Sequence, residues 1–277
     1  MNNNIVIING SYVQMSGLCD RIYLIKLCND NIPATIFELD KIAQGQIFTK
    51  IIAKVPSTSK ELFLNNGYKI EAHIPGFYNN EIDVYFMGKF LTEDREFCLN
   101  KELIEDVLNK SLNKADTPQK CDLEGEFYFK KIEESEAAKL THLYKEVFET
   151  YPFPIFNTEY IIEAMRTNNE YFGIWKDKEL VATGSAEKDI EGQNAEVTDF
   201  AILPEYRGKT FSICLIKEIE KILRTQNFKT AYTIARAGSY GMNIAFARMK
   251  YIFAGTLINN TCISGNVEDM HVWYKKL

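Results

Sequence analysis

The stretch Asn-Ala-Glu-Val-Thr-Asp-Phe-Ala-Ile-Leu-Pro-Glu-Tyr-Arg-Gly-Lys-Thr-Phe-Ser, residues 194–212, decides the fold. Its first half alternates and is rich in β-branched and aromatic side chains, which predicts a strand that Pro204 ends. The basic turn at residues 207–209 then opens a long amphipathic helix, so backbone N–H groups and two cations meet at the helix start. This arrangement predicts a binding site for a pyrophosphate group.

A carboxylate lies in the same strand, at Glu196. A carboxylate close to an anion-binding turn indicates a general base acting on a substrate whose reaction partner is a phosphorylated carrier. Asp199 is the alternative base. Regular alternation would place Asp199 on the opposite face of the strand from Glu196, but a β-bulge would re-aim it.

The segment after residue 126 has the pattern of an α/β unit with a mixed sheet. Polar, turn-rich residues at 112–126 predict a domain boundary before it. The apolar spacing then predicts, in chain order, a strand (127–132), two helices (138–148 and 158–166), a hairpin (171–176 and 179–187), the strand at 195–203, the helix after Thr210, a strand (230–235), a helix (241–250) and two strands (251–261 and 270–275). We therefore expect one domain at residues 126–277.

The amino-terminal part repeats the second half of this pattern. Phe63 stands before Gly67-Tyr68 as Phe246 stands before Lys250-Tyr251, and the segments around Phe63 parallel those from Thr230 onward. The first 115 residues contain neither a basic turn like 207–209 nor a strand-borne Glu ahead of the repeat. We expect residues 1–117 to form a truncated copy that lacks the anion site and serves in packing, in closing the substrate cleft or in dimerisation.

Composition narrows the class of protein. A formal net charge of −6 argues against a nucleic-acid-binding surface, which needs a basic face. The six cysteines are scattered without C-x-x-C spacing, so reduced thiols are expected, and the three histidines have no metal-ligand spacing, so no metal is expected. No apolar run approaches the ~18 residues of a membrane span. We expect a cytoplasmic protein without membrane contacts.

Several segments resemble one family. The turn at 207–212 is similar to the Arg/Gln-x-x-Gly-x-Gly/Ala signature of the GNAT acetyltransferases, although Thr210 and Ser212 replace its small residues. Resemblance to the β-lysine N6-acetyltransferases is carried by Tyr-Pro-Phe-Pro-Ile-Phe (151–156), by residues 196–209, by Tyr-Thr-Ile-Ala-Arg-Ala (232–237), by Ser-Tyr-Gly-Met-Asn (239–243), and by residues 255–261 and 272–275. Ile-Pro-Gly-Phe (74–77) and Tyr-Phe-Met-Gly-Lys-Phe (85–90) extend it over most of the chain.

The resemblance implies a GNAT fold with acetyl-CoA as co-substrate. The pyrophosphate would lie on Arg207, Gly208, Lys209, Thr210, Phe211 and Ser212, and the pantetheine on the backbone of Phe200, Ala201 and Ile202 and on the amide of Asn243. For Thr210, whose Cβ disfavours positive φ, we expect ordinary helical angles and a capping role. Asn243 fits a helix N-cap equally well.

The resemblance also implies how the reaction is catalysed. Glu196 occupies the strand position that carries the base in some GNAT enzymes, acting directly or through water. Neutralising a lysine-type amine at pH 7 costs about 4–5 kcal/mol, so such help is needed. Many GNAT enzymes carry a tyrosine acid where this chain has Phe246. Tyr240, Ser239 or Tyr232 would replace it, or the thiolate leaves unprotonated.

The acceptor implied by the resemblance is a small amine, β-lysine, acetylated on N6 to give an osmoprotectant. Its carboxylate and two amines require one cation and several acceptors. By position, we expect Arg236 either to bind the carboxylate or to form a structural ion pair, and Glu187, Tyr151 and Phe153 to line the acceptor site. Two alternatives remain: an N-acetyltransferase for another small diamine or amino acid, and an inactive coenzyme A-binding sensor. A serine hydrolase, suggested by the turn at 237–241, is rejected because no room for its sheet remains.

Overall fold

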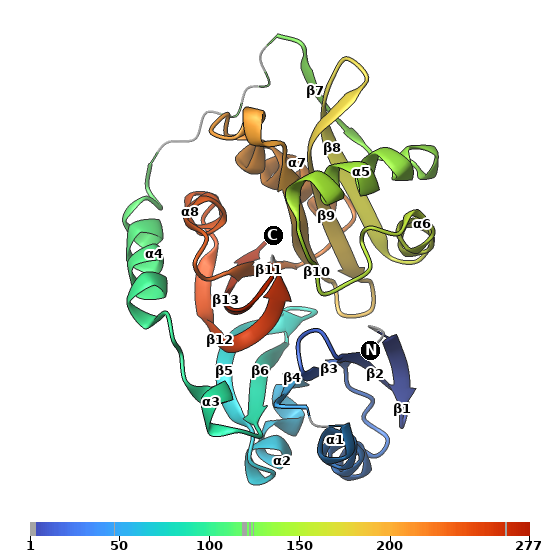
Figure 1. The fold of residues 1–277 in the computed structure, drawn as a ribbon, viewed down its shortest axis with the longest axis vertical. Helices are drawn as coiled ribbons and strands as arrows, with labels where there is room; N and C mark the ends of the chain where they lie inside the picture. The colour runs from blue at the N-terminus through green and yellow to red at the C-terminus, as the bar shows by residue number, and fades with distance from the viewer. Residues whose placement is uncertain (1–3, 47, 118–120, 122, 124, 264) are drawn as a thin grey trace.

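A computed structural model describes residues 4–46, 48–117, 121, 123, 125–263 and 265–277. Thirteen strands form one mixed sheet in the order β1-β2-β3-β4-β6-β5-β12-β13-β11-β10-β9-β8-β7. The amino-terminal half of the chain forms one end of this sheet and the carboxy-terminal half forms the other, as the blue-to-cyan and green-to-red parts of the ribbon show (Figure 1). No helix in the described ranges is long and apolar enough to cross a membrane.

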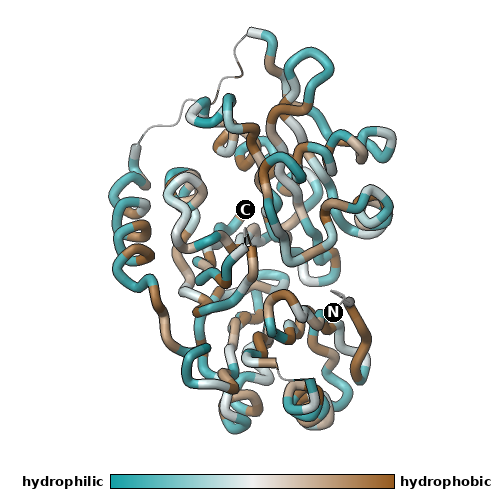
Figure 2. Tube along the Cα trace, in the orientation of Figure 1, coloured by the Kyte–Doolittle hydropathy of each residue, from teal (hydrophilic) through white to brown (hydrophobic). Residues whose placement is uncertain are grey.

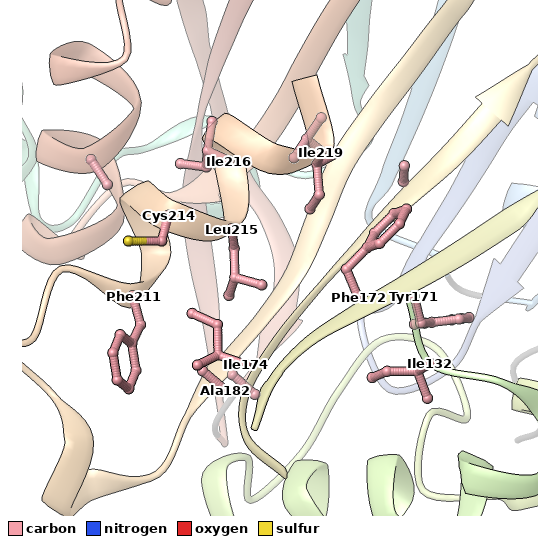
Figure 3. Packing of buried hydrophobic residues seen from close by; sticks show 14 of the residues in the cluster. Ile132, Tyr171, Phe172, Ile174, Ala182, Phe211, Cys214, Leu215, Ile216 and Ile219 are labelled. Atoms are coloured by element: carbon pink, nitrogen blue, oxygen red, sulfur yellow. The ribbon is translucent and has the colours of Figure 1, made fainter. Parts of the chain in front are cut away.

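The carboxy-terminal half has the predicted element order. Its elements are β7 (Phe127–Lys131), α5 (Ala137–Val147), α6 (Thr158–Arg166), β8 (Asn169–Lys176), β9 (Glu179–Asp189), β10 (Asn194–Ile202), α7 (Phe211–Thr225), β11 (Thr230–Arg236), α8 (Tyr240–Arg248), β12 (Ile252–Ile263) and β13 (Asn266–Lys276), with 3₁₀ turns at Glu134–Glu136 and Pro204–Tyr206. Residues 180–186 of β9 are all buried, which requires cover on both faces of the sheet. Phe211 and Leu215 of α7 point toward Ile174 and Ala182 of the sheet (Figure 3).

The amino-terminal half follows a similar order. Its elements are β1 (Asn4–Ile8), β2 (Ser11–Ser16), β3 (Arg21–Lys26), α1 (Ile32–Gln46), β4 (Lys50–Pro56), α2 (Lys60–Asn65), β5 (Lys69–Tyr78), β6 (Ile82–Phe90), α3 (Glu93–Glu96) and α4 (Lys101–Asn113), with a 3₁₀ turn at Ser57–Ser59. The run β1-β2-β3-β4-β6-β5 has the same order and pairing directions as β8-β9-β10-β11-β13-β12. The structure therefore contains two copies of one strand pattern.

Equivalent side chains of the two copies make equivalent contacts. The rings of Phe63 and Tyr68 meet edge-on at 5.0 Å, and those of Phe246 and Tyr251 meet edge-on at 4.9 Å. In both pairs the tyrosine N–H donates to the phenylalanine carbonyl, at 3.1 and 3.0 Å. The ring pair closes the same turn after α2 and after α8, which explains why this part of the repeat is visible in the sequence.

The two copies join at β5 and β12, which pair antiparallel at Ala72 and Gly255. A Cβ on Gly255 would lie 2.2 Å from the carbonyl oxygen of Glu71, so only glycine allows the strands to approach this closely. The sheet then curls. β4 and β11 are five strands apart, about 24 Å in a flat sheet, yet the Nζ of Lys54 lies 3.5 Å from the Oη of Tyr232.

An apolar cluster to which both copies contribute fills the junction between them. It includes Ile52 and Phe77 from the first copy and Tyr232 and Val272 from the second. Figure 2 shows hydrophobic residues in the strands of both halves, while α4 alternates between hydrophobic and hydrophilic residues and packs beside α8. The junction is thus a continuous hydrophobic core and not a flexible hinge.

A buried ion pair reinforces the junction. Lys50 donates to Glu71 at 2.8 Å, and both side chains are almost fully buried. Both partners also bind β12, because Lys50 donates to the carbonyl of Ile258 at 2.6 Å and Glu71 accepts its N–H at 2.7 Å. Burial lowers the pKa of Lys50 to about 8 and raises the pKa of Glu71 above its usual value. Each buried charge is therefore stabilised by the opposite charge of its partner.

Removing one member of this pair should destabilise the protein strongly. We expect Lys50→Met to lower the free energy of unfolding by about 3–5 kcal/mol, because Glu71 would remain buried without a counter-ion. Adding Glu71→Leu should recover much of the loss. The exposed Lys41–Glu38 pair is the control, and Lys41→Met should cost less than about 1 kcal/mol. Urea unfolding measures all three; equal losses at Lys50 and Lys41 would contradict the assignment.

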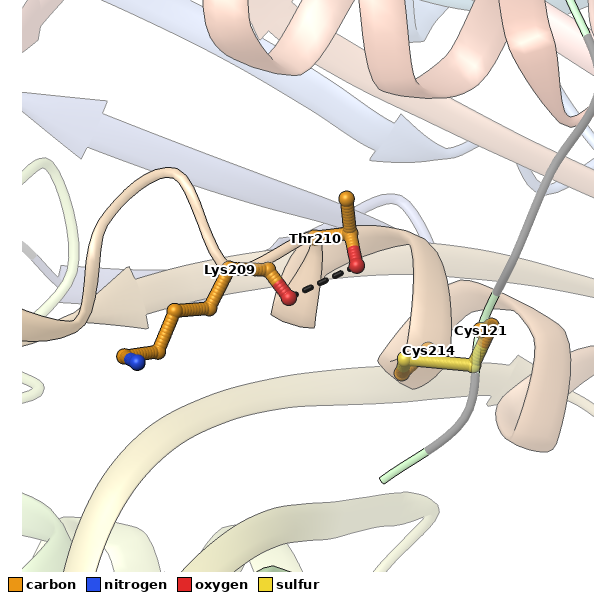
Figure 4. Close-up of a disulfide and its surroundings, with 4 residues drawn as sticks. All are labelled: Cys121, Lys209, Thr210 and Cys214. Atoms are coloured by element: carbon orange, nitrogen blue, oxygen red, sulfur yellow. Dashed lines mark hydrogen bonds between the residues drawn. A yellow bond between two sulfur atoms is a disulfide. The ribbon is translucent and has the colours of Figure 1, made fainter. Parts of the chain in front are cut away.

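One expectation about the cysteines is wrong. Cys121 and Cys214 form a disulfide, whereas all six thiols were expected to be reduced. The bond ties the segment between the two copies to the first turn of α7 (Figure 4). Sequence spacing did not indicate the pair, since the two cysteines are 93 residues apart. Residues 118–120, 122 and 124 of the predicted boundary at 112–126 lie outside the described residues.

Candidate functional site

The site is created where β10 leaves β11. The two strands pair in parallel only from Asn194 to Glu196, opposite Thr230 to Tyr232. β10 continues along β9 to Ile202, with a shift of register between Thr198 and Ala201. Asp199 lies in this bulge with a φ of 53°, so the bulge that would re-aim it is present. Beyond Glu196, the β11-facing edge of β10 is therefore open to a ligand.

A cavity of ≈ 1460 Å³ occupies this opening and extends into the junction of the two copies. It reaches from the basic turn at Arg207 and Gly208 to residues of the amino-terminal copy. The predicted site residues that line it are Tyr151, Phe153, Glu187, Glu196, Asp199, Phe200, Ile202, Arg207, Gly208, Ser212 and Arg236. The structure thus brings the predicted base, turn and acceptor residues around one space.

The basic turn has the form of an anion cradle. Gly208 has a φ of 82°, which glycine adopts without strain, and a Cβ there would meet open space. The turn leads into the first turn of α7, where the side chain of the N-cap residue Thr210 accepts no hydrogen bond from the backbone. Arg207 and Lys209 are exposed beside it, and Phe211 is buried against Phe127 at 5.0 Å. Phe211 can therefore offer only its backbone to a ligand.

Thr210 differs from the expectation. Its φ of 62° and ψ of 15° are left-handed and not helical, and its side chain caps no N–H group of α7. The hydroxyl instead donates to the carbonyl of Lys209 at 2.6 Å (Figure 4). The turn requires at Thr210 a conformation that glycine adopts freely, although a β-branched residue pays strain for it. The turn's geometry outweighs the preference of the residue.

Relieving this strain should not harm the protein. We expect Thr210→Gly to leave acetyl-CoA binding unchanged and to keep or raise stability by up to about 1 kcal/mol, because the left-handed penalty disappears while some chain entropy is lost. Thr210→Ala is the matched control, since it removes the hydroxyl but keeps the Cβ. Thermal unfolding and calorimetry compare the two; a Thr210→Gly variant less stable than Thr210→Ala would contradict the argument.

The stretch predicted to hold pantetheine lies along the open edge. Phe200 and Ile202 are half-buried and line the cavity, while Ala201 is buried and pairs with Thr183 of β9. The ring of Phe200 meets edge-on at 5.7 Å the ring of Phe246, the residue that stands where the family resemblance implied a tyrosine acid. The cavity wall here is apolar apart from backbone groups, which suits an aliphatic arm.

Asn243 has a structural task instead of the expected pantetheine contact. It is fully buried, and its amide donates to the carbonyls of Arg236 and Ser239 at 2.9 and 2.7 Å. Its oxygen accepts from the indole N–H of Trp273 at 2.8 Å and lies 3.1 Å from the Nδ1 of His271. These contacts use its hydrogen-bonding capacity, so the side chain fixes α8 against β11 and β13.

Tyr240 also departs from its predicted role. Its side chain is 37% exposed, its hydroxyl donates to Asp106 of α4, and it is absent from the cavity lining. Lys110 lies over its ring at 5.2 Å. The tyrosine joins α4 to α8 at the surface, and its hydroxyl is engaged there with Asp106. Tyr232 and Ser239, the other two hydroxyls considered, both line the cavity.

Three carboxyl groups gather at the closed end of the opening. Glu196 and Glu187 are direct partners across β10 and β9. Asp199 accepts hydrogen bonds from Tyr151 at 2.6 Å and from Ser185 at 3.0 Å. Burial raises the pKa of all three above their usual values, and the charges of the neighbouring carboxylates raise it further at Glu187 and Glu196. The three groups therefore titrate as a coupled set.

Glu196 is the member that can exchange a proton near neutral pH. Burial raises its pKa to about 7, against the charge of Lys54 and a hydrogen bond from Tyr232, both of which lower it. A carboxyl with such a pKa can take a proton from an amine and release it again at physiological pH. Its position at the last paired residue of β10 places it at the vertex of the opening.

Arg236, which was expected either to bind the carboxylate of the acceptor or to form a structural ion pair, forms an ion pair within the protein. Arg236 lines the cavity, but its guanidinium forms an ion pair with Glu268 at 2.7 Å. It also follows Tyr232 by four residues, about 13 Å along the strand. Arg236 therefore lies on the cradle side of the opening. Tyr151, Phe153 and Glu187 do line the closed end, as expected from their positions.

Sequence reasoning missed the residues that the first copy adds. Arg21, Tyr23 and Lys54 line the same cavity, from β3 and β4. Lys54 is separated from Tyr232 by 178 positions in the sequence. No local pattern around these residues indicates a site, because only the curl of the sheet carries them to the carboxyl groups.

The pH dependence of the reaction should report Glu196. Because a base acts when it is deprotonated, kcat/KM should rise with pH and level off above an apparent pKa near 7. Lys54→Met should move this pKa up by about 1 pH unit, since a nearby cation favours the carboxylate. Glu196→Gln should lower kcat by about 10²–10⁴ at unchanged acetyl-CoA affinity. A wild-type profile retained in Glu196→Gln would transfer the role to Asp199 or to water.

Comparison with known proteins places this geometry in a family. The model of the Acetyltransferase (GNAT) family matches residues 135–249. The chain is 42% identical to the β-lysine N(6)-acetyltransferase of Methanococcus maripaludis over 98% of both proteins. It is 33% identical to the N-acetyltransferase YodP of Bacillus subtilis over 80% of this chain and 78% of that protein. It is 30% identical to the β-lysine N(6)-acetyltransferase of Methanosarcina mazei over 86% and 95%, respectively.

The open strand edge, the cradle and the family match together define an acetyltransferase of the GNAT type. Within that superfamily, the chain belongs to the family of the β-lysine N6-acetyltransferases. The family match and the mixed sheet confirm the predicted GNAT fold.

Proposed function

We propose that this protein transfers the acetyl group of acetyl-CoA to the N6 amine of β-lysine, giving the compatible solute N6-acetyl-β-lysine. The full-length similarity to two proteins of that name supports the acceptor. The observation that carries the chemistry is the place of Glu196, at the vertex of an opening whose other end is an anion cradle. A base and a carrier site are thereby held on one strand.

The residues act on a ternary complex. Acetyl-CoA supplies the thioester when bound, with its pyrophosphate on the cradle and its pantetheine along Phe200 to Ile202. Glu196 takes the proton of the N6 ammonium directly or through water, and the neutral amine attacks the thioester carbon. A C–N bond forms and the C–S bond breaks. The second proton that the nitrogen loses passes to the departing coenzyme A thiolate through Tyr232, or to water when the thiolate leaves unprotonated. No covalent enzyme intermediate is required.

The first copy, residues 1–117, fits a truncated GNAT-like domain without a coenzyme site. Tyr23 stands at the third paired position of β3, which Glu196 occupies in β10. The turn from β3 to α1 carries Asp30 and no basic cluster, and Asn31 accepts from the N–H of Ala34 at 3.2 Å. Both hallmarks of the catalytic copy are absent there. We place the protein in the cytoplasm, and a homodimer remains compatible with this architecture.

The rival readings rest on specific observations. Three carboxyl groups in the cavity would also suit a diamine without a carboxylate. The replacements Thr210, Ser212 and Phe246 would suit a coenzyme A sensor that has lost turnover. The retained left-handed turn at Thr210 and the pKa of Glu196 favour an active enzyme.

Steady-state thiol release across β-lysine, α-lysine, ornithine, cadaverine and spermidine separates these readings. We expect β-lysine to have the highest kcat/KM, with cadaverine about 10- to 100-fold lower, the worth of about 1.4–2.7 kcal/mol of lost charged contacts. Mass spectrometry of the product should place the acetyl group on N6. Acetylation on N3, or cadaverine used as well as β-lysine, would refute the substrate; no thiol release with any amine would favour the sensor.

A further inference from the structure

The first copy places an unusual charge in the cavity. Arg21 is 3% exposed, lines the cavity, and has no carboxylate within 4 Å among the residues that the structure describes. A guanidinium cannot lose its proton at accessible pH, and a buried cation without a counter-ion is costly. Cys19 and Glu196 act on this charge through space, but neither forms an ion pair with it in the described structure, so the site suits a carboxylate that arrives from outside the chain.

The neighbours of Arg21 hold it in place without neutralising it. One terminal nitrogen, Nη1, donates to the carbonyl of Asn260 at 2.7 Å and to the hydroxyl of Thr261 at 2.9 Å. The other, Nη2, makes only a long contact of 3.5 Å with Gln14, and the Nε has no partner within the described chain. The side chain is thus anchored by Nη1 to β12, while the edge formed by Nε and Nη2 is largely unused.

That unused edge is the one with which arginine binds carboxylates. Nε and Nη2 point in the same direction and match the two oxygens of a carboxylate. This chain uses the same edge elsewhere: Arg166 binds Glu134 through Nε at 3.1 Å and Nη2 at 2.7 Å. In Arg21 the corresponding fork is preformed, buried and empty of a partner in the described structure.

The surroundings of Arg21 belong to the acceptor end of the cavity. Gln14, which contacts Arg21, donates to the carbonyl of Pro152 at 3.0 Å, in the turn that carries Tyr151 and Phe153. Arg21 also acts through space on Glu196, whose carboxylate it stabilises. The guanidinium therefore faces the same space as the base but belongs to a different wall.

The other cations of the cavity are less suitable. Lys54 lies 3.5 Å from the hydroxyl of Tyr232, which in turn bonds Glu196, so it stands beside the reacting amine. In an extended acceptor the carboxylate is about 7 Å from N6, six bonds away at ~1.2 Å each. Arg236 is paired with Glu268 on the cradle side. Lys26 and Lys188 also line the cavity but are paired with Glu191 and Glu170, and Arg207 belongs to the cradle turn. Arg21 remains as the cation that is both separate from the base and on its acceptor side.

We propose that Arg21, in the non-catalytic first copy, binds the carboxylate of the acceptor through its Nε and Nη2 edge and so determines the specificity of the second copy for amino acids over simple amines. This proposal rests on the proposed function and adds a substrate subsite to it. Glu187 and Asp199 then face the remaining ammonium group of the acceptor. The catalytic domain alone would lack the carboxylate site, which gives the first copy a direct role in the reaction.

The test crosses enzyme variants with substrates that differ in one group. The substrates are β-lysine, 6-aminohexanoate, which keeps the carboxylate and the terminal amine, and cadaverine, which lacks the carboxylate. We expect Arg21→Gln to lower kcat/KM for the two carboxylate-bearing substrates by about 10- to 100-fold, mainly through KM. Cadaverine turnover and the KM of acetyl-CoA should change less than about threefold. Arg21→Lys, which keeps the charge but not the fork, should restore part of the loss.

Two control variants separate the carboxylate site from other roles. Lys54→Met should shift the pH profile for all three substrates without changing the preference for carboxylates. The nearby Cys19 thiol has a pKa lowered to about 5, chiefly by a hydrogen bond from Cys262 and partly by the charge of Arg21. If a Cys19 thiolate were the counter-ion of Arg21, Cys19→Ala would alter carboxylate preference as strongly as Arg21→Gln; we expect no such change.

The outcomes distinguish this proposal from the proposed function. An equal loss for cadaverine and the carboxylate-bearing substrates in Arg21→Gln would overturn the subsite, because it would show a purely structural effect. A wild-type enzyme that prefers α-lysine or ornithine would refute β-lysine as the acceptor. The Arg21 subsite would survive that result if Arg21→Gln still lost the preferred amino acid selectively.

Discussion

The separation of β10 from β11 after three paired residues is the constraint on which the rest of the site depends. A sheet that kept pairing here would leave no free strand edge, no cavity and no place for a pantetheine arm. The bulge at Asp199 makes the separation possible, because it turns the strand and shifts its register against β9. The same strand then delivers Glu196 to the closed end of the opening and the cradle to the other end.

Both copies contribute charged side chains to the cavity. The second copy contributes three carboxyl groups, of which Asp199 is buried and Glu187 and Glu196 are half-buried, and the first contributes Arg21 and Lys54. In a low dielectric these charges shift one another's protonation, which keeps Glu196 a weak enough acid to act near pH 7. The arrangement has a cost for folding. Because the pKa of Glu196 is raised in the folded protein, its contribution to stability is present below about pH 4.5 and is lost as the pH rises through about 7.

The two copies show how a repeated fold can divide its labour. Both keep the strand order and the ring pair after the second helix, and they join at the close approach of Ala72 and Gly255. The first copy has Tyr23 in place of the base, and an asparagine-capped turn in place of the cradle. Its strands instead form a wall of the cavity, held by a shared hydrophobic core and the buried Lys50–Glu71 pair. A rigid wall of this kind can position a substrate group relative to the base.

The sequence by itself determined the order of elements in the second copy, the cradle turn and the strand that carries Glu196, because each rests on local periodicity, on glycine and proline positions or on a family motif. It also indicated the repeat, since Phe63 and Tyr68 form the same local turn as Phe246 and Tyr251. Local rules were insufficient where distant contacts dominate. Thr210 takes a left-handed conformation that its turn imposes. Asn243 forms hydrogen bonds with buried partners, and Tyr240 donates a hydrogen bond to Asp106 of α4. Only the tertiary structure brought Arg21 and Lys54 to Glu196, because this proximity comes from the curl of a thirteen-stranded sheet, to which residues far apart in the chain contribute together.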